Sequence, residues 1–377
     1  MGFYLGQHEF ESELKQHINL SEAAWLIIYE DIGEFDSGKT SFAGFLNRIF
    51  LNFYQKAKAS ISFRLLEKKN ELSRVLASPK LGKLTSAERD LVMAQMIEAH
   101  KAALIAQATA YPKGHGDKFR IGKKMLQLLK DSSEQSYYDN SIGLYLKAIY
   151  EEYASLRRYE REAIYFKDTI DVVQSAMRNG WKLKIVQKEK SNVAETAKYA
   201  NQFYVAPHRI VQDTTQSFNY ILGYVQRIDG RTDLAETLDT RLGNASTLRI
   251  SRIDRIAEMT SMGGHISAEN KDKLEKMLSE RTAAYMATGP KDIVVRFSKK
   301  GIDSFHNQIY MRPMSFTIGD KNPDESVEIR FHCSEIQAMN YLFKVGLEIE
   351  VLSPASLREK FIERYRDALK VYQRDAA

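Results

Sequence analysis

Residues 141–155 repeat the pattern of residues 41–55 at an offset of 100 positions, and this repeat restricts the possible fold more than any other feature. In the first copy, apolar residues recur at spacings of three and four, which places them on one face of an α-helix. The second copy keeps this face. The identical pairs are Ser41 with Ser141, Leu46 with Leu146 and Ile49 with Ile149, and the aromatic pairs are Phe45 with Tyr145, Phe50 with Tyr150 and Phe53 with Tyr153. The repeat indicates an internal duplication.

A short segment of alternating polar and apolar residues precedes each copy, at residues 15–20 and 118–121. Each unit therefore reads as strand, helix, turn and helix, near residues 15–56 and 117–157. This arrangement resembles the ribbon-helix-helix fold of small DNA-binding proteins, in which two units pair their strands into a ribbon that enters a groove. The two copies could pair within one chain, or each could pair with a partner subunit. Because such units work in pairs, we expect a homodimer.

Two further helices have clear start signals. Thr85-Ser86-Ala87-Glu88 has the form of a capping box and predicts a long helix to about Ala110, which would act as a spacer or dimerisation helix. Ser267 is the expected N-cap of a helix over residues 267–286 that stops before Gly289.

The polar face of the first predicted strand is the candidate nucleic-acid surface of the N-terminal half. Side chains alternate along a strand, so Lys15, His17 and Asn19 share one face. An ordinary solvated edge strand explains the same pattern equally well. The candidate nucleic-acid-binding residues of this half are Lys15, His17, Asn19, Lys39, Lys118, Arg120 and Lys123.

Composition limits the class of protein. The chain has 377 residues, of which 44% are hydrophobic and 28% charged, so it can bury real cores and is not disordered as a whole. No apolar run approaches the ~18 residues of a membrane span, and residues 1–6 do not resemble a secretory signal. We therefore expect no membrane partner. A single cysteine, Cys333, excludes an internal disulfide, which is typical of a protein in the reducing cytoplasm, so we expect a cytoplasmic protein. The net charge of +6 permits nucleic-acid binding without demanding it.

The fold class expected is α+β, with several domains. Residues 1–164 read as helical and contain the two ribbon-helix-helix-like units. Residues 165–262 are expected to form a β-domain, because short aromatic and β-branched runs begin at about Trp181. Residues 263–377 read as a linker helix followed by an α+β domain.

Residues 33–40, GEFDSGKT, satisfy the phosphate-binding pattern GxxxxGK[ST], in which Lys39 would reach the phosphates and Thr40 would hold magnesium. The context argues against this site, because Glu34 and Asp36 would lie beside the bound phosphates and no alternating series of strands and helices follows. A glycine turn between two helices is the ordinary interpretation, with Thr40 or Ser41 as N-cap. Lys39 beside a helix N-terminus would still suit a nucleic-acid phosphate.

No other pattern points to catalysis or to a cofactor. The eight histidines never fall four residues apart, no HExxH or GxSxG motif occurs, and a lone cysteine cannot begin a CxxC zinc site. We therefore expect a protein that is not an enzyme and that has no metal or cofactor.

The middle of the chain carries a recognisable pattern. Residues 203–211, FYVAPHRIV, are followed by residues 218–224, FNYILGY, and by residues 248–253, LRISRI. Together these segments resemble the WYL domain of bacteria, a small SH3/Sm-like β-barrel, although Asn219 stands where the namesake tryptophan would be. Residues 345–359 resemble the C-terminal extension that commonly follows WYL domains.

The resemblance implies a regulatory module that senses ligands, nucleic acid among them. Arginine offers several donors to phosphate, and a tyrosine ring can stack on a base. An ordinary ion pair of Arg252 with Asp229 or Asp233 is the alternative for that residue. Carried over position by position, the resemblance nominates His208, Arg209, Tyr220, Arg249 and Arg252 as ligand-binding residues.

Most WYL regulators begin with a winged helix-turn-helix, whereas this chain begins with ribbon-helix-helix-like units. That combination resembles the WYL accessory proteins of type VI-D CRISPR systems. The resemblance implies a protein that binds single-stranded RNA, with DNA not excluded, and that enhances cleavage by a partner, the type VI-D effector nuclease.

Three alternatives stay open at this point. A transcription regulator would bind duplex DNA through the ribbon and sense a ligand through the WYL domain. A nucleotide-binding protein would use residues 33–40, and a purely structural interaction module would bind no nucleic acid.

Overall fold

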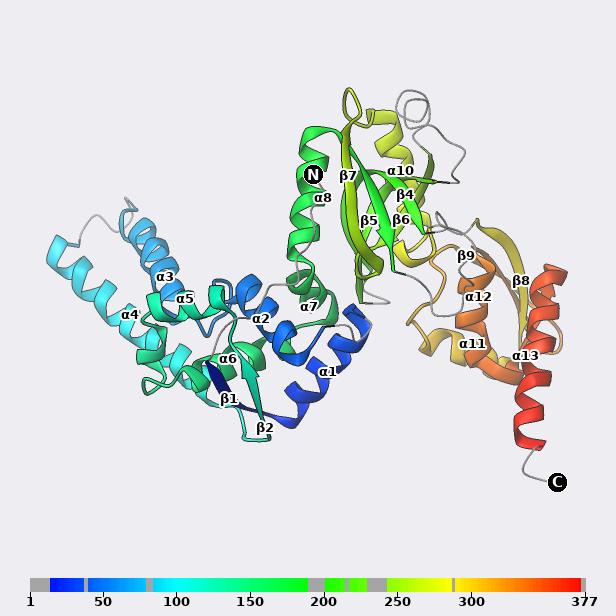
Figure 1. Ribbon diagram of the computed structural model, residues 1–377. Coiled ribbons are helices and arrows are strands. Elements are labelled where there is room, and N and C mark those ends of the chain that lie inside the picture. The colour runs from blue at the N-terminus through cyan, green and yellow to red at the C-terminus, as the bar shows by residue number, and fades with distance from the viewer. Residues whose placement is uncertain are drawn as a thin grey trace. The chain divides into compact units, whose positions relative to one another are not determined.

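A computed structural model of the chain divides into two compact units, one ending at Ile170 and the other beginning at Asp171 (Figure 1). The structure describes residues 14–36, 40–78, 84–188, 201–213, 217–228, 243–286 and 289–373. The first unit is mainly helical, and the second contains two antiparallel sheets. The α+β class expected from the sequence is confirmed. The finer division at residues 164 and 262 stays a prediction.

The first unit pairs the two predicted strands within one chain. Strand β1 (Lys15–Leu20) lies antiparallel to β2 (His115–Arg120) and forms a two-stranded ribbon. The helices of this unit are α1 (Glu22–Asp36), α2 (Phe42–Phe53), α3 (Ile61–Leu76), α4 (Ser86–Thr109), α5 (Lys123–Asp131), α6 (Ile142–Ser155) and α7 (Arg158–Tyr165), and α8 (Lys167–Asn179) leads into the second unit. A strand followed by two helices thus occurs twice, as β1-α1-α2 and β2-α5-α6.

The repeated helices α2 and α6 form the centre of the first core. Their shared apolar positions are almost completely buried. These positions are Phe45, Leu46, Ile49, Phe50 and Phe53 on α2, and Tyr145, Leu146, Ile149, Tyr150 and Tyr153 on α6. The three tyrosine hydroxyls of α6 are all hydrogen-bonded, to Ser60, to the Leu46 carbonyl and to Asp31. Because a buried hydroxyl without a partner is costly, these bonds let tyrosine take the place of phenylalanine in the second copy.

A buried ion pair ties α1 to α7. Arg161 donates from Nε and Nη2 to the two carboxylate oxygens of Asp31 at 2.7 and 3.0 Å. The hydroxyl of Tyr153 donates to the same carboxylate at 2.8 Å. Asp31 is fully buried, so these three bonds compensate a charge that would otherwise be strongly unfavourable in the core.

The segment between the two copies is a pair of long helices. Helix α4 begins at the predicted capping box, in which Thr85 accepts from the Glu88 amide and the Glu88 carboxylate accepts from the Thr85 amide. Its end at Thr109 agrees with the predicted end near Ala110. Of its 24 residues only Leu104 is buried, and α3 packs along it.

Five strands of the second unit form one antiparallel sheet in the order β6-β5-β4-β3-β7. These strands are β3 (Trp181–Gln187), β4 (Gln202–Asp213), β5 (Phe218–Arg227), β6 (Asn244–Arg249) and β7 (Ile253–Ser261). A 3₁₀ turn, η3 (Ile250–Arg252), joins β6 directly to β7. No ladder pairs β6 with β7 among the described residues, so the expected barrel is open there.

Helix α10 (Ala268–Glu280) and the 3₁₀ turn η4 (Ala283–Tyr285) cover one face of this sheet (Figure 1). Ser267 is the N-cap, as predicted, and accepts from the Asn270 amide. The helix ends at Glu280, six residues before the predicted end, because the next residues leave the helix and pack η4 against the sheet.

The last part of the chain builds a second sheet in the order β11-β8-β10-β9, with every neighbouring pair antiparallel. Its elements are β8 (Lys291–Phe297), α11 (Lys299–Asn307), β9 (Phe316–Lys321), β10 (Val327–Cys333), α12 (Glu335–Leu342) and β11 (Ile349–Ser353). This is the βαββαβ arrangement of ferredoxin-like folds. Helix α13 (Ala355–Gln373) follows and adds Leu357 and Phe361 to the core.

Residues 33–36, the first half of the predicted phosphate-binding loop, form part of a helix. Gly33 and Asp36 both lie within helix α1, whereas a phosphate cradle needs a loop between a strand and a helix. The Thr40 hydroxyl donates to the Asp36 carboxylate, so it is not presented to a magnesium ion. The nucleotide-binding alternative therefore gains no support from residues 33–36 or from Thr40, and it stays a prediction. Lys39 itself lies outside the described residues.

Candidate nucleic-acid interface and ligand pocket

The outer face of the β1–β2 ribbon gathers four of the predicted residues. The register places Lys15 opposite Arg120 and His17 opposite Lys118. All four side chains are exposed, while Ile18, on the inner face, is buried. None of the four makes an ion pair within the part of the chain that the structure describes. Two adjacent cross-strand pairs thus present only basic side chains to solvent.

Asn19 belongs to the same strand but is partly engaged in holding the ribbon. Its side-chain oxygen accepts from the Gly114 amide at 2.8 Å, just before β2 begins. Opposite Asn19 stands Gly116, where a Cβ would come within 3.0 Å of the His17 ring. Because Gly116 has no side chain, there is room for the His17 imidazole beside it.

Lys123 begins helix α5 and is exposed, three residues beyond Arg120. The turn between them is held from α2, because Asn47 donates to the Arg120 carbonyl at 2.9 Å and accepts from the Gly122 amide at 2.7 Å. Asn47 is not among the predicted site residues, although a polar residue on the buried face of a helix is unusual and could have indicated it.

The predicted ligand residues of the five-stranded sheet fall into two groups. His208 and Arg209 on β4 both face Glu275 on α10. His208 Nε2 lies 2.9 Å from Glu275 Oε1, and Arg209 Nη2 donates to Oε2 at 2.9 Å. The Glu275 carboxylate therefore binds two of the side chains that the resemblance nominates for the ligand, His208 and Arg209.

Tyr220 and Arg249 form the second group. They stand opposite each other on β5 and β6, and Tyr220 is only 6% exposed because it packs in the core beneath α10. The Arg249 guanidinium lies over the Phe218 ring, 3.1 Å from its centroid, and donates to the Ser251 hydroxyl at 2.7 Å. Cation–π contact and hydrogen bond together fix the plane of this guanidinium.

Arg252 lies in η3 and is exposed. Its carbonyl accepts from the Lys188 amide at 2.9 Å, and Lys188 Nζ donates to the Ser251 carbonyl at 2.9 Å. The structure thus adds Lys188 to the predicted set, and no local signal in the sequence indicates it. Asp229 and Asp233, the alternative partners of Arg252, lie outside the described residues.

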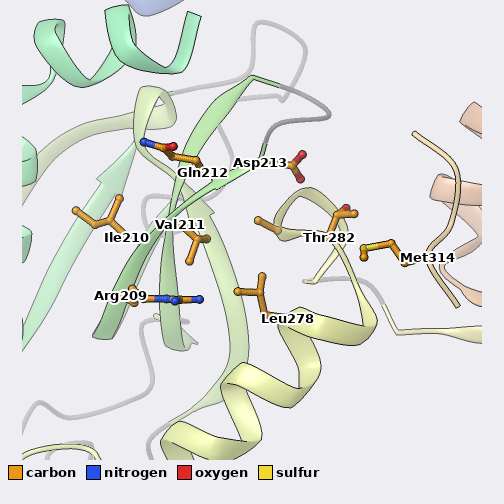
Figure 2. A pocket seen from close by; sticks show the side chains of 9 residues that line it. Arg209, Ile210, Val211, Gln212, Asp213, Leu278, Thr282 and Met314 are labelled. Carbon is orange, nitrogen blue, oxygen red and sulfur yellow. The ribbon is translucent and has the colours of Figure 1, made fainter. Parts of the chain in front are cut away.

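A pocket of about 480 Å³ opens beside β4 (Figure 2). Of the five nominated residues of this sheet, Arg209 alone lines it. The lining residues are Arg209, Ile210, Val211, Gln212, Asp213, Leu278, Thr282, Ala283 and Met314. The Asp213 carboxylate accepts from the Ala284 amide at 2.9 Å, which anchors η4 to the end of the strand.

Metal and nucleophile chemistry has little support in the described residues. Among them, no group of three or more His, Cys, Asp or Glu side chains is arranged to hold a metal ion. Burial raises the pKa of the Cys333 thiol to about 12, so at neutral pH it stays protonated and is a poor nucleophile. No described helix is long and apolar enough to cross a membrane.

Comparison with known proteins agrees with this architecture. Residues 290–369 match the family model of the WCX domain, which covers most of the βαββαβ sheet and α13. A solved structure described as "Crystal structure of a CRISPR Cas-related protein" has 20% sequence identity to this chain and a TM-score of 0.70. The match covers 97% of this chain and 95% of the other.

A second solved structure, proteasome accessory factor B/C (PafBC) of Arthrobacter aurescens, has 13% identity, with 65% of this chain and 35% of that chain covered. Its TM-score of 0.27 is too low to indicate a shared fold. No curated protein matches the sequence. The chain thus carries a WCX-type domain at residues 290–369 and shares its overall fold with a solved CRISPR Cas-related protein, in agreement with the resemblance that the sequence indicated.

Proposed function

We propose that the protein is a CRISPR-associated accessory protein, without catalytic activity of its own, that binds single-stranded nucleic acid through the outer face of the β1–β2 ribbon. Its WCX-type domain and its fold likeness to a CRISPR Cas-related protein support the accessory role. Single-stranded RNA is the ligand we favour, and a type VI-D effector nuclease is the partner whose RNA cleavage it would enhance.

The observation that carries this proposal is the pair of basic cross-strand contacts, Lys15 with Arg120 and His17 with Lys118. Like charges that face each other on a strand pair are unfavourable unless a counter-charge binds there. A nucleic-acid backbone supplies that counter-charge, and it releases condensed ions when it binds. Exposed basic side chains on a rigid ribbon thus suit phosphate contacts, which position a nucleic acid without reading its sequence.

The five-stranded sheet would contribute a second contact through Arg249 and Arg252. Phe218 and Ser251 hold the Arg249 guanidinium in place, and Arg252 is exposed beside Lys188. For His208 and Arg209 to bind phosphate as well, they must exchange Glu275 for the ligand. Tyr220 would support this surface from the core, because its ring is buried rather than open to a base.

The test is fluorescence anisotropy with labelled single-stranded RNA, single-stranded DNA and duplex DNA at about 50 mM and about 200 mM salt. We expect tight binding to the single strands that weakens steeply with salt. The double variant Lys118→Gln/Arg120→Gln should bind at least about tenfold more weakly and show a shallower salt slope. The matched control, Lys69→Gln/Arg74→Gln on α3, removes the same charge from the same unit and should bind normally. If both double variants bind alike, the ribbon is not the site.

A transcription regulator is the second candidate, and the ribbon itself favours it, because two-stranded ribbons can read the major groove of duplex DNA. It predicts tight duplex binding with sequence preference and weak binding to single strands. The accessory role has a separate test, which is RNA cleavage by a purified type VI-D effector with and without the protein.

The homodimer stays a prediction. The expectation rested on ribbon-helix-helix units working in pairs, and here two units pair their strands within one chain. Light scattering on the purified protein would measure the oligomeric state directly.

A further inference from the structure

Among the described residues, no strand covers one edge of β4 along half of its length. On one side it pairs with β5 from Phe203 to Asp213. On the other side β3 pairs only with residues 202–205. Within the described residues, therefore, positions 208–213 have a strand neighbour on one side alone.

The pocket beside β4 lies along this edge. Successive side chains of a strand point to opposite faces, so a pocket over one face would be lined by alternate residues. This pocket is lined by five consecutive residues, 209–213, and it therefore borders the backbone of the strand. Figure 2 shows Val211 directed towards Leu278, and Ile210 on the other side of the strand.

The exposed backbone of such an edge needs partners. In an antiparallel pair, alternate residues exchange both hydrogen bonds with the neighbouring strand, and the residues between them direct N–H and C=O groups outward. Along residues 208–213 these outward groups meet the pocket. A second extended chain could pair with them and lengthen the sheet.

The side chains around the edge suit an apolar residue of such a chain. Val211, Leu278 and Met314 provide apolar walls, and the Thr282 hydroxyl is buried without a hydrogen-bond partner in the described residues. The volume of about 480 Å³ is sufficient for one or two side chains. Five strand residues span roughly 17 Å, which corresponds to a peptide of about five residues.

Charge disfavours a nucleic acid at this position. Asp213 lies in the lining, and the guanidinium of Arg209, the cation of the lining, is held by Glu275. A phosphate backbone placed here would meet the carboxylate of Asp213, and Arg209 could bind it only by leaving Glu275. A peptide backbone carries no charge and avoids this repulsion.

We propose that the free edge of β4 binds an extended peptide segment of a partner protein by strand addition, with an apolar side chain of the peptide in the pocket. The ribbon and the β4 edge lie in different units of the chain, so this docking site shares no residue with the ribbon. It would give an accessory protein a means to hold a protein partner while the ribbon holds RNA.

The probe for this proposal is a phage-displayed library of random peptides of roughly twelve residues, selected on the full-length protein. A selected peptide is then synthesised with a fluorescent label and its binding measured by anisotropy. Leu278→Lys should weaken binding at least about tenfold, because it places a charge in the apolar part of the pocket. The control Leu369→Lys, at an exposed position on α13 in the same unit, should leave binding unchanged.

N-methylation of the peptide gives a second test that leaves the protein unaltered. Methylation removes one backbone donor at a time. Strand addition predicts a period of two, in which methylation of alternate amides weakens binding at least about tenfold and methylation of the intervening amides has little effect. This result would stand even if Leu278→Lys folded poorly.

Three results would overturn the proposal. The first is a selection that recovers no peptide dependent on Leu278, and the second is a peptide whose binding shows no period of two. The third is competitive displacement of the peptide by single-stranded RNA from the Lys118→Gln/Arg120→Gln variant, since the edge would then bind RNA.

Discussion

Glu275 holds two of the side chains that the sequence nominates for ligand binding. It accepts from Arg209 and lies at 2.9 Å from His208 Nε2, so neither group is presented to solvent as an isolated cation. A ligand phosphate must displace this carboxylate. The same contact stabilises the packing of α10 on β4.

This arrangement predicts the effect of removing one charge. Glu275→Gln keeps the size of the side chain but releases His208 and Arg209 to bind phosphate, so affinity for single-stranded RNA should rise severalfold. Glu269→Gln on the same helix, which removes the carboxylate that pairs with Lys273, is the matched control. Anisotropy titrations measure both variants. Unchanged affinity in Glu275→Gln would remove His208 and Arg209 from the nucleic-acid surface.

Glu335 makes stability depend on pH. Hydrogen bonds from Lys291, Lys360 and Ser356 hold the pKa of Glu335 at about 2, below its ordinary 4.5. Below pH 4.5 the unfolded chain therefore binds this proton more readily than the folded chain, and stability falls as the pH drops from about 4.5 towards 2.

Glu335→Gln should remove this part of the acid sensitivity. The variant should be less stable than the wild type at neutral pH, and the difference should shrink as the pH falls through that range. Urea unfolding of the second unit at a series of pH values measures the effect. Glu359→Gln on α13, an exposed carboxylate, should leave the pH profile unchanged, and an equal change in both variants would contradict the assignment.

Helix caps are the elements in which the duplication is easiest to compare. Ser41 caps α2 by accepting from the Gly44 amide at 3.1 Å, and Ser141 caps α6 by accepting from the Leu144 amide at 3.3 Å. Both caps stand at the start of a helix whose apolar face fills the first core. Removing either cap should therefore cost a similar amount of stability.

Ser41→Ala and Ser141→Ala should each destabilise the first unit by roughly 0.5–2 kcal/mol. Because the two caps share no partner, the double variant should lose about the sum of the two effects. Urea unfolding followed by circular dichroism gives the free energies. Ser73→Ala, on the exposed part of α3, is a control that removes a hydroxyl from a helix without removing a cap.

The two compact units should be separable in the whole molecule. Each has its own sheet or ribbon and its own buried core, and the chain passes between them at Ile170 and Asp171. A protein of this kind does not unfold in one two-state step. Its parts open with different free energies.

We expect residues 1–170 alone to fold and to unfold in one cooperative transition. The full chain should show this transition together with a second one from residues 171–377. Calorimetry on the fragment and on the full chain measures both. A single transition in the full chain, with an unfolded fragment, would contradict the independence of the units.

Local patterns in the sequence were sufficient for much of the fold. The apolar faces of α2 and α6, the capping box at Thr85 and the N-cap at Ser267 depend on residues within one or two helical turns, and all lie where they were predicted. The outward position of Lys15 and His17 also follows from alternation along a strand. A short-range hydrogen bond or a helical period can be recognised because its partners are close in the chain.

The remaining features depend on residues that are far apart in the chain. Pairing of β1 with β2 joins segments on either side of four helices, and it decided that the ribbon forms within one chain. Contact of Glu275 with His208 and the early end of α10 at Glu280 both come from packing of α10 and η4 against the sheet. The uncovered edge of β4 exists because β3 begins too late in the register to reach residue 208. Sequence determined which segments are helices and strands, since local hydrogen bonds and periodicity set these. Only the tertiary structure decided which charges are neutralised and which strand edge stays open, because those depend on contacts between distant segments.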